Sequence, residues 1–361
     1  MSERIHNFSA GPAVLPLPVL EQAQREMISL PGVGMSVLEI SHRSKHFEAI
    51  LAQAQQSLRQ LLQLPDNYHL LFLQGGASLQ FSMLAMNFLK GCKAGYIACG
   101  SWASKAIEEA RREGEVQVVW NGKSEGYVRM PQDHELEIGE DLAYLHMTSN
   151  ETIQGIAYRH DPDSRGLPLI CDASSDFLSR PLQMQKYAMI YAGAQKNVGP
   201  AGVTLVILRD DLLATRPEGL HTMLDYKTFT DSNSLYNTPP VFAIYMVGLV
   251  ARWLQEQGGL EAVHAHNRAK SELLYSVIDA SGGFYRGHAH PDSRSLMNVT
   301  FRLPSEELET RFVKAAQAKG LDGLKGHRSV GGIRASIYNA FPLDGVEVLA
   351  DFMETFRKSE Q

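Results

Sequence analysis

One lysine, Lys196, stands in a stretch where an ordinary surface lysine is not expected. An apolar run of strand length, 188–192, leads through Gly193 and Ala194 to this lysine, and a Gly-Pro-Ala-Gly turn follows at 199–202. Partial desolvation of an ammonium group lowers its pKa and makes the amine a usable nucleophile. On this stretch alone a solvent-facing loop lysine is the alternative, but the pattern favours a lysine that forms a Schiff base.

Two further side chains follow apolar strands in the same way. Asp172 ends the apolar run 167–171, and Trp102 comes shortly after the run 96–99. Ligands of open α/β sheets bind beyond the carboxyl ends of the parallel strands, so we expect both side chains to lie near Lys196. A buried acid is costly unless a positive group lies beside it. The tryptophan offers a flat face on which a ring could stack, with packing in the core as its alternative.

A glycine-led turn, Gly75-Gly76-Ala77-Ser78, follows another apolar run and opens a helix. Backbone N–H groups at such a helix start bind phosphate. The turn has neither the Gly-x-Gly-x-x-Gly pattern nor the lysine of a P-loop, which disfavours a nucleotide. Lysine, aspartate, aromatic ring and phosphate cradle together indicate pyridoxal phosphate. Lys196 would bind this cofactor covalently, and Asp172 would pair with the pyridinium nitrogen so that the ring remains an electron sink.

The apolar runs alternate with helical patterns over the first two thirds of the chain. Strands that are apolar on both faces and separated by helices indicate an α/β fold, with a mostly parallel central sheet covered by helices on both faces. The expected strands are 70–73, 96–99, 116–120, 142–147, 167–171, 188–192 and 203–208. The last third is predicted to form a smaller α+β C-terminal domain from strands 297–303 and 333–337 and helices 306–319 and 346–358.

We predict three parts of the chain. They are an N-terminal segment, 1–15, that packs with the small domain, a large cofactor-binding domain, 16–258, and the small domain, 259–361. Between them, the polar and turn-rich segment 212–240 interrupts the alternation of strands and helices. A structureless loop of this length in a compact domain indicates a function or a partner on which it lies.

The bulk composition bounds the class of protein. Of 361 residues, 44% are hydrophobic and 20% charged, as in ordinary soluble proteins. The net charge of −6 argues against a general nucleic-acid binder, which would need a basic face. Three cysteines without a Cys-x-x-Cys pair argue against a disulfide framework. The start lacks the apolar core of a signal peptide, and no apolar run approaches the ~20 residues that cross a bilayer. We therefore predict a soluble cytoplasmic protein with no membrane partner.

Several motifs resemble those of the phosphoserine aminotransferases, a family of class V aminotransferases, and the match runs nearly end to end. These motifs are Asn7-Phe8-Ser9-Ala10-Gly11-Pro12-Ala13, Ser41-His42-Arg43, 150–156, 191–202, 236–240 and 326–340. The resemblance implies the aspartate-aminotransferase-like fold, which is fold type I of the pyridoxal phosphate enzymes. It also implies reversible transfer of the amino group of L-glutamate to 3-phosphohydroxypyruvate. The products are O-phospho-L-serine and 2-oxoglutarate, in serine biosynthesis.

The resemblance also implies roles for individual residues. Lys196, Asp172 and Trp102 would be catalytic, as the covalent lysine, the pyridinium contact and the stacking ring. Asn237 and Thr238 would reach the cofactor phosphate of the neighbouring subunit in a homodimer with shared active sites, which would explain the segment 212–240. The full set of implied cofactor contacts is Ala77, Ser78, Trp102, Thr152, Asp172, Gln195, Lys196, Asn237 and Thr238.

Both implied substrates are anions with a carboxylate beside the reacting carbon. A bidentate arginine is the natural partner of that carboxylate, and Arg334 is the candidate. The substrate phosphate and the distal carboxylate of glutamate need a second cationic cluster, for which two His-Arg pairs are available: His42-Arg43 and His327-Arg328. We expect Arg43 and Arg328 to select the distal anion.

Three alternatives are open at this point. A cysteine desulfurase would need a mobile nucleophilic cysteine, whereas Cys92, Cys99 and Cys171 fall near the ends of expected elements. A non-catalytic protein could retain the phosphate cradle without the chemistry. Metal binding by the segment 287–292, with His288 and His290, lacks further ligands, so no metal is predicted. Activity on 4-phospho-hydroxythreonine in pyridoxine biosynthesis is a further possibility for the same substrate chemistry.

Overall fold

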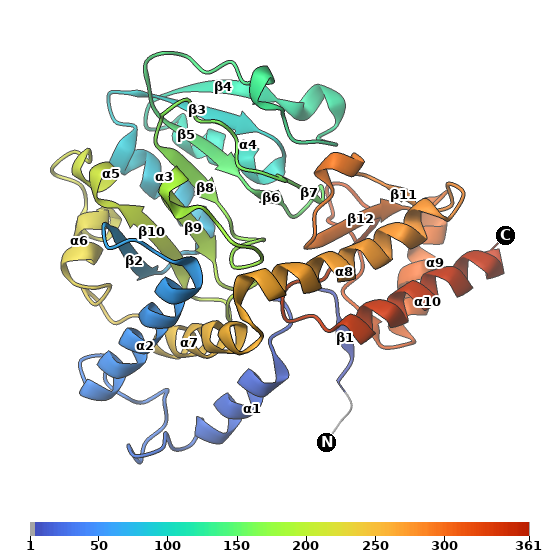
Figure 1. The fold of residues 1–361 in the computed structure, drawn as a ribbon, viewed down its shortest axis with the longest axis horizontal. Helices are drawn as coiled ribbons and strands as arrows, with labels where there is room; N and C mark the ends of the chain where they lie inside the picture. Colours follow the sequence, from blue (N-terminus) through green and yellow to red (C-terminus); the bar gives the residue numbers. More distant parts are fainter. Residues whose placement is uncertain (1–3, 361) are drawn as a thin grey trace.

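A seven-stranded sheet forms the centre of the structure, a computed structural model that describes residues 4–360 (Figure 1). Its strand order is β2-β10-β9-β8-β5-β3-β4. Strand β10 is antiparallel to both of its neighbours, and all other pairs are parallel. The predicted mostly parallel sheet is therefore confirmed. The strands are β2 (Tyr68–Leu73), β3 (Lys93–Ala98), β4 (Glu115–Asn121), β5 (Leu142–Thr148), β8 (Leu169–Asp172), β9 (Tyr187–Gly193) and β10 (Thr204–Arg209).

Helices cover both faces of this sheet because its strands carry apolar side chains on both faces. In β2, Leu70 and Phe72 belong to the core shared with α1, α2 and α7, whereas Leu71 and Leu73 belong to the core shared with α3 and α4. This is the alternation that a strand imposes on successive side chains. The helices are α1 (Leu17–Glu26), α2 (Lys45–Leu62), α3 (Gly76–Phe88), α4 (Ser101–Ala110) and α7 (Val241–Glu256).

A smaller three-stranded antiparallel sheet lies beside the large one, to its right in Figure 1. It contains β11 (Arg286–Gly287), β12 (Asn298–Arg302) and β14 (Ile333–Ser336), and it packs with α8 (Gly259–Asp279), α9 (Glu306–Gln317) and α10 (Leu343–Glu360). Near the N-terminus, β1 (His6–Asn7) pairs in parallel with β13 (Leu321–Asp322). Phe8 is buried in the core of this smaller unit. The domain boundaries themselves remain a prediction.

The segment 212–240 is not the structureless loop that its composition suggested. It contains the end of α5 (Asp210–Ala214) and a further short helix, α6 (Tyr226–Asp231). Tyr226 and Phe229 of α6 are buried in the core over α3. The helix was missed because only two of its six residues carry the apolar signal, and a six-residue segment is too short to display helical periodicity.

Lys270 of helix α8 binds the chain segment that follows β14 through hydrogen bonds. This lysine is fully buried, and its Nζ donates to the carbonyls of Ile337 at 3.0 Å, Tyr338 at 2.6 Å and Phe341 at 3.0 Å. An ammonium group has three N–H donors, so all three are satisfied without a carboxylate.

We expect Lys270→Met to lower the free energy of unfolding by about 2–4 kcal/mol, because three buried carbonyls lose their donor. Denaturant unfolding measures the change. The matched control is Arg268→Met on the exposed side of the same helix, where a loss below about 0.5 kcal/mol is expected. Equal losses in the two variants would contradict this account.

Candidate active site

A cavity of about 300 Å³ opens at the carboxyl edge of the large sheet. It gathers residues that follow β2, β3, β5, β8 and β9, together with residues of the smaller unit. Most of the predicted site residues line it, namely Ala77, Ser78, Trp102, Thr152, Asp172, Gln195, Lys196, His327 and Arg334. Residues that are distant in sequence thus meet where a parallel sheet presents its strand ends.

Lys196 lines this cavity. Its Nζ donates to Thr152 Oγ1 at 2.7 Å and lies 5.4 Å from the centroid of the Trp102 ring. Burial lowers the pKa of this amine to about 8, although the charges of Asp172 and Glu151 oppose the shift. A substantial fraction of the amine is therefore neutral, and nucleophilic, near physiological pH.

Asp172 is held at the last position of β8, in register with Thr148 of β5 and Tyr191 of β9. Its Oδ1 accepts the backbone N–H of Ser174 at 2.9 Å. Burial raises the pKa of this carboxyl, while the hydrogen bond to Ser174 and the charge of Lys196 oppose the rise. A cationic ring nitrogen bound beside it would supply the further positive partner that a buried carboxylate needs.

The turn before α3 has the geometry of an anion cradle. Gly75 and Gly76 adopt φ values of 89° and 68°, in the left-handed region that favours glycine. A Cβ on Gly75 would also lie 2.5 Å from a side-chain carbon of Leu79. No side chain of the N-cap residue caps α3, so its first N–H groups and the Ser78 hydroxyl are available to a phosphate.

The cavity wall also carries polar atoms without partners among the described residues. Trp102 Nε1, Thr148 Oγ1 and Arg334 Nε are buried and make no hydrogen bond. Such orphaned groups are uncommon in native proteins unless a ligand or water completes them. Together with the lysine, the acid and the cradle, they fit a planar, phosphorylated pyridine cofactor.

Arg334 reaches the cavity from β14 of the smaller unit. It is half-buried, and no carboxylate of the described residues forms an ion pair with it. Burial lowers the pKa of its guanidinium from the ordinary arginine value. An anion bound here would therefore stabilise the charged form of the side chain. His327 lies at the same wall, where its Nδ1 and Ser329 Oγ are 2.7 Å apart.

Five predicted residues lie outside this cavity in the single chain. His42 and Arg43 precede α2, and Arg43 Nε donates to His42 Nε2 at 3.4 Å. Arg328 lines a separate cleft with Lys314 and Lys325. Asn237 and Thr238 lie near the end of β2, where Gln74 Nε2 donates to Thr238 O at 3.3 Å. The roles of these five residues therefore remain predictions that involve a second subunit or a movement of the chain.

Glu151 is the functional candidate to which sequence reasoning assigned no role. It is fully buried in β6 (Asn150–Glu151), which pairs with β7 (Ile156–Ala157). The only sequence signal is its position after an apolar strand, next to Thr152. Its bonds are to backbone N–H groups, which a sequence does not reveal.

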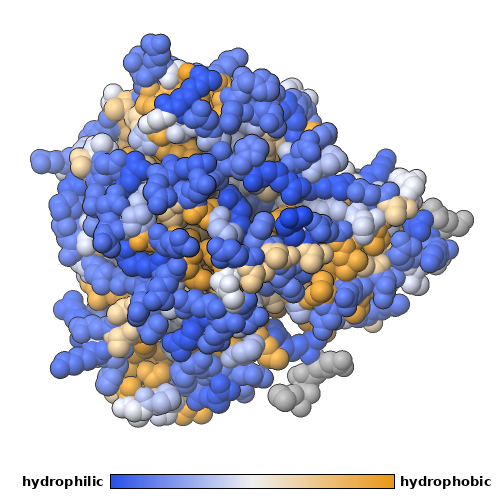
Figure 2. Space-filling view, in the orientation of Figure 1, coloured by the Kyte–Doolittle hydropathy of each residue, from blue (hydrophilic) through white to orange (hydrophobic). Residues whose placement is uncertain are grey.

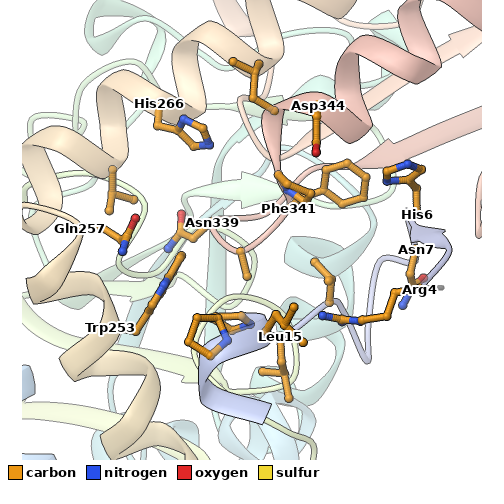
Figure 3. A pocket seen from close by; sticks show the side chains of 18 of the residues that line it. Arg4, His6, Asn7, Leu15, Trp253, Gln257, His266, Asn339, Phe341 and Asp344 are labelled. Carbon is orange, nitrogen blue, oxygen red and sulfur yellow. The ribbon is translucent and has the colours of Figure 1, made fainter. Parts of the chain in front are cut away.

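A larger cavity, of about 620 Å³, lies elsewhere (Figure 3). Figure 3 shows Arg4, His6 and Asp344 toward one end and Trp253 and His266 toward the other. It shares no lining residue with the cavity around Lys196. Size alone does not identify the reactive site, because the lysine, the acid and the phosphate cradle all belong to the smaller cavity.

The comparisons with known proteins agree with this geometry. An aminotransferase class V family model matches residues 5–349. The chain belongs to the class V aminotransferases. It is 54% identical to the phosphoserine aminotransferase of Niallia circulans over 360 residues, with 99% of each chain covered. It is also 54% identical to that of Geobacillus kaustophilus, again with 99% of each chain covered.

Solved structures of phosphoserine aminotransferases have the same fold as this chain. The phosphoserine aminotransferase from Bacillus circulans subsp. alkalophilus superposes with a TM-score of 0.98 at 54% identity over 100% of both chains. The pyridoxal phosphate-bound enzyme from Trichomonas vaginalis has a TM-score of 0.92 at 40% identity, covering 97% of this chain and 100% of that one. The predicted fold type I, phosphoserine aminotransferase function and pyridoxal phosphate-dependent transaminase chemistry are confirmed by these relatives.

The cysteine desulfurase alternative is correspondingly disfavoured. Cys99 and Cys171 are buried, and Cys92 precedes β3, at the amino end of that strand and away from the cavity.

In the part of the chain that the structure describes, no helix is long and apolar enough to cross a membrane.

The perturbed amine of Lys196 gives a direct test of the site. In the full-length chain without cofactor, we expect acylation of Lys196, followed by peptide mass spectrometry, to show an inflection near pH 8. Asp172→Asn should move the inflection to lower pH, because the lost negative charge no longer favours the ammonium form. Lys227, which is exposed, serves as an internal control for the acylation reaction. An ordinary lysine value at Lys196 would contradict the description of the site.

Proposed function

We propose that this chain transfers the amino group of L-glutamate to 3-phosphohydroxypyruvate, with pyridoxal phosphate held in the cavity around Lys196. The observation that carries the proposal is the partly neutral amine of Lys196, which lies 5.4 Å from the centroid of the Trp102 ring and is affected by the charge of Asp172. It occurs in a chain that matches named phosphoserine aminotransferases over its whole length. A non-catalytic phosphate-binding protein would have no use for such an amine.

The cofactor, when bound, supplies the electron sink that makes the substrate Cα–H acidic. Lys196 would hold the cofactor covalently, and its amine, when free, would take up and return the proton of the substrate Cα. Asp172 would keep a negative charge beside the ring nitrogen, and Trp102 would cover one ring face. Thr152, already bonded to the amine, would orient it.

Substrate recognition would rest on the cationic side chains that line the cavity from the smaller unit. Arg334, half-buried and without an ion-pair partner among residues 4–360, would bind the carboxylate next to the reacting carbon through a bidentate contact. His327 lies beside it, where the distal anion of either substrate would approach. The same charge pattern would accept 4-phospho-hydroxythreonine. The transamination assay used for phosphoserine, repeated with this compound as amino donor, tests that activity.

The distal-anion cluster would be completed by a second copy of the chain. Large apolar side chains are exposed at Leu17, Ile28, Met35 and Leu38, on α1 and the loop that follows it. Figure 2 shows apolar surface at this lower edge of the molecule. Exposed apolar area of this kind marks interaction surfaces. The loop leads directly to His42 and Arg43, so a homodimer formed here would bring this pair to a neighbouring cavity. The cytoplasm is the compartment in which such a dimer would work.

The visible spectrum tests the function. The purified chain should show a visible absorption band with pyridoxal phosphate, because the covalently bound cofactor is a conjugated system, and phosphoserine should bleach this band. Lys196→Ala should abolish turnover and lose the covalent link that borohydride fixes in the wild-type chain. Product analysis with 2-oxoglutarate should find glutamate. A wild-type chain without this band and without turnover would contradict the proposal.

Mixing inactive variants tests whether the active sites are shared. Lys196→Ala and Arg43→Ala chains, unfolded and refolded together, should regain about a quarter of wild-type activity, because half of the dimers contain one intact site if Arg43 serves its partner. The matched control is Lys196→Ala mixed with Arg334→Gln, which should regain no activity, since Arg334 and Lys196 share one cavity in one chain. No recovery in the first mixture would assign Arg43 to its own subunit or to no site.

A further inference from the structure

Helix α4, which carries Trp102, begins in an unusual way. Its N-cap residue is Gly100, which has no side chain to accept the first N–H groups of the helix. In most helices a serine, threonine, aspartate or asparagine at the N-cap accepts hydrogen bonds from these N–H groups. Here the acceptors come from residues about fifty positions further along the chain.

Two side chains of the segment after β5 satisfy these groups. Glu151 Oε2 accepts the N–H of Trp102 at 3.0 Å, and Glu151 Oε1 accepts that of Ala103 at 2.8 Å. Gln154 Oε1 accepts the N–H of Ser101 at 3.4 Å, while Gln154 Nε2 donates to Ser101 Oγ at 2.8 Å. The first three N–H groups of α4 therefore all bond to one short segment.

Gly100 is required by this arrangement. A Cβ at this position would lie 2.4 Å from Glu151 Cδ, closer than any stable contact. The backbone of Gly100 is extended, with a φ of −176°, so conformational strain does not explain the glycine. Close approach of the carboxylate does.

The segment that holds α4 also delivers a residue to the reactive amine. Thr152, between Glu151 and Gln154, accepts the hydrogen bond from Lys196 Nζ. The segment is anchored in turn to β12 of the smaller unit, where Thr300 Oγ1 donates to Gln154 O at 2.8 Å. Asn150 Nδ2 likewise donates to Asn298 Oδ1 at 2.8 Å.

We propose that Glu151, with Gln154, is a positioning residue of the active site: by holding the start of α4 it fixes the Trp102 ring relative to Lys196 and Thr152. A buried carboxylate is a costly way to cap a helix, and a local N-cap would leave the ring free to move with α4. The distant acid instead joins the two sides of the cavity. This inference rests on the proposed function only in that the ring is taken to cover the cofactor.

The charges around Glu151 give this role an electrostatic consequence. Burial raises the pKa of the carboxyl to about 7, against the two backbone hydrogen bonds from α4. The ionisable groups that couple with it are Asp172, Lys196 and the buried thiol of Cys99. When ionised, Glu151 favours the ammonium form of Lys196. Removing its charge should therefore lower the pKa of Lys196, so Glu151 acts on the reactive amine as well as on the start of α4.

The test compares Glu151→Gln with Glu109→Gln in the full-length chain. Glu109 lies on the same helix and accepts from Ser82 Oγ at 3.0 Å, outside the cavity. The first readout is the ¹⁵N indole resonance of Trp102, assigned with Trp102→Phe. The second is the dissociation constant of pyridoxal phosphate, and the third is the acylation inflection of Lys196 without cofactor.

For Glu151→Gln we expect a shifted indole resonance, about tenfold weaker cofactor binding from the loss of a charge-assisted bond, and a Lys196 inflection at lower pH. Glu109→Gln should change none of the three. Gln154→Ala, a milder change, should also shift the indole resonance and keeps the test valid if Glu151→Gln does not fold. An unmoved Trp102 resonance in the folded variants, with only a lower melting temperature, would overturn the inference.

Because the indole resonance is measured without substrate, it reports on the positioning role alone. The wild-type spectrum and turnover report on the proposed function. Failure of one is therefore distinguishable from failure of the other.

Discussion

Desolvation of one amine is the constraint on which this structure depends. A buried ammonium is unfavourable, so Lys196 shifts toward the neutral form that the chemistry uses. The shift is moderate because two buried carboxyl groups, Asp172 and Glu151, lie near it and favour its charged form. Burial without these acids would make the amine a poor proton carrier, and acids without burial would leave it fully protonated. The balance requires all three groups to be enclosed together.

A parallel sheet encloses them with little further structure. The strand ends of β5, β8 and β9 lie side by side, so residues after each strand share one edge. For this reason Asp172, Trp102, Lys196 and the glycine turn could be predicted from sequence as one site. Each of them follows an apolar run that forms a strand, and such runs can be recognised in the sequence without the structure. The same reasoning could not find Glu151, whose bonds go to backbone groups of a helix distant in sequence.

The substrate side was less accessible to sequence reasoning. Arg334 comes from the smaller unit, and its place in the cavity depends on how that unit packs, which no local pattern encodes. The two His-Arg pairs were expected to form one cluster, yet only His327 lines the cavity within the chain. Charge and motif identify candidate anion-binding residues, but they do not show which residues meet in one cavity, and in the proposed homodimer a second chain would complete the cluster. The apolar residues on α1 and the following loop are the physical reason to look there.

The links between the two units constrain how the site can move. Asn339 of the smaller unit donates its N–H to Asn197 Oδ1 at 2.9 Å, directly beside Lys196. Thr300 and Asn298 hold the segment that carries Glu151 and Thr152. A shift of the smaller unit would thus displace Arg334 and, through these bonds, the partners of Trp102 and Lys196 as well. Binding of a substrate carboxylate at Arg334 would therefore be coupled energetically to the stacking ring and to the reactive amine. Such coupling would let a substrate of the correct charge align the groups that act on it.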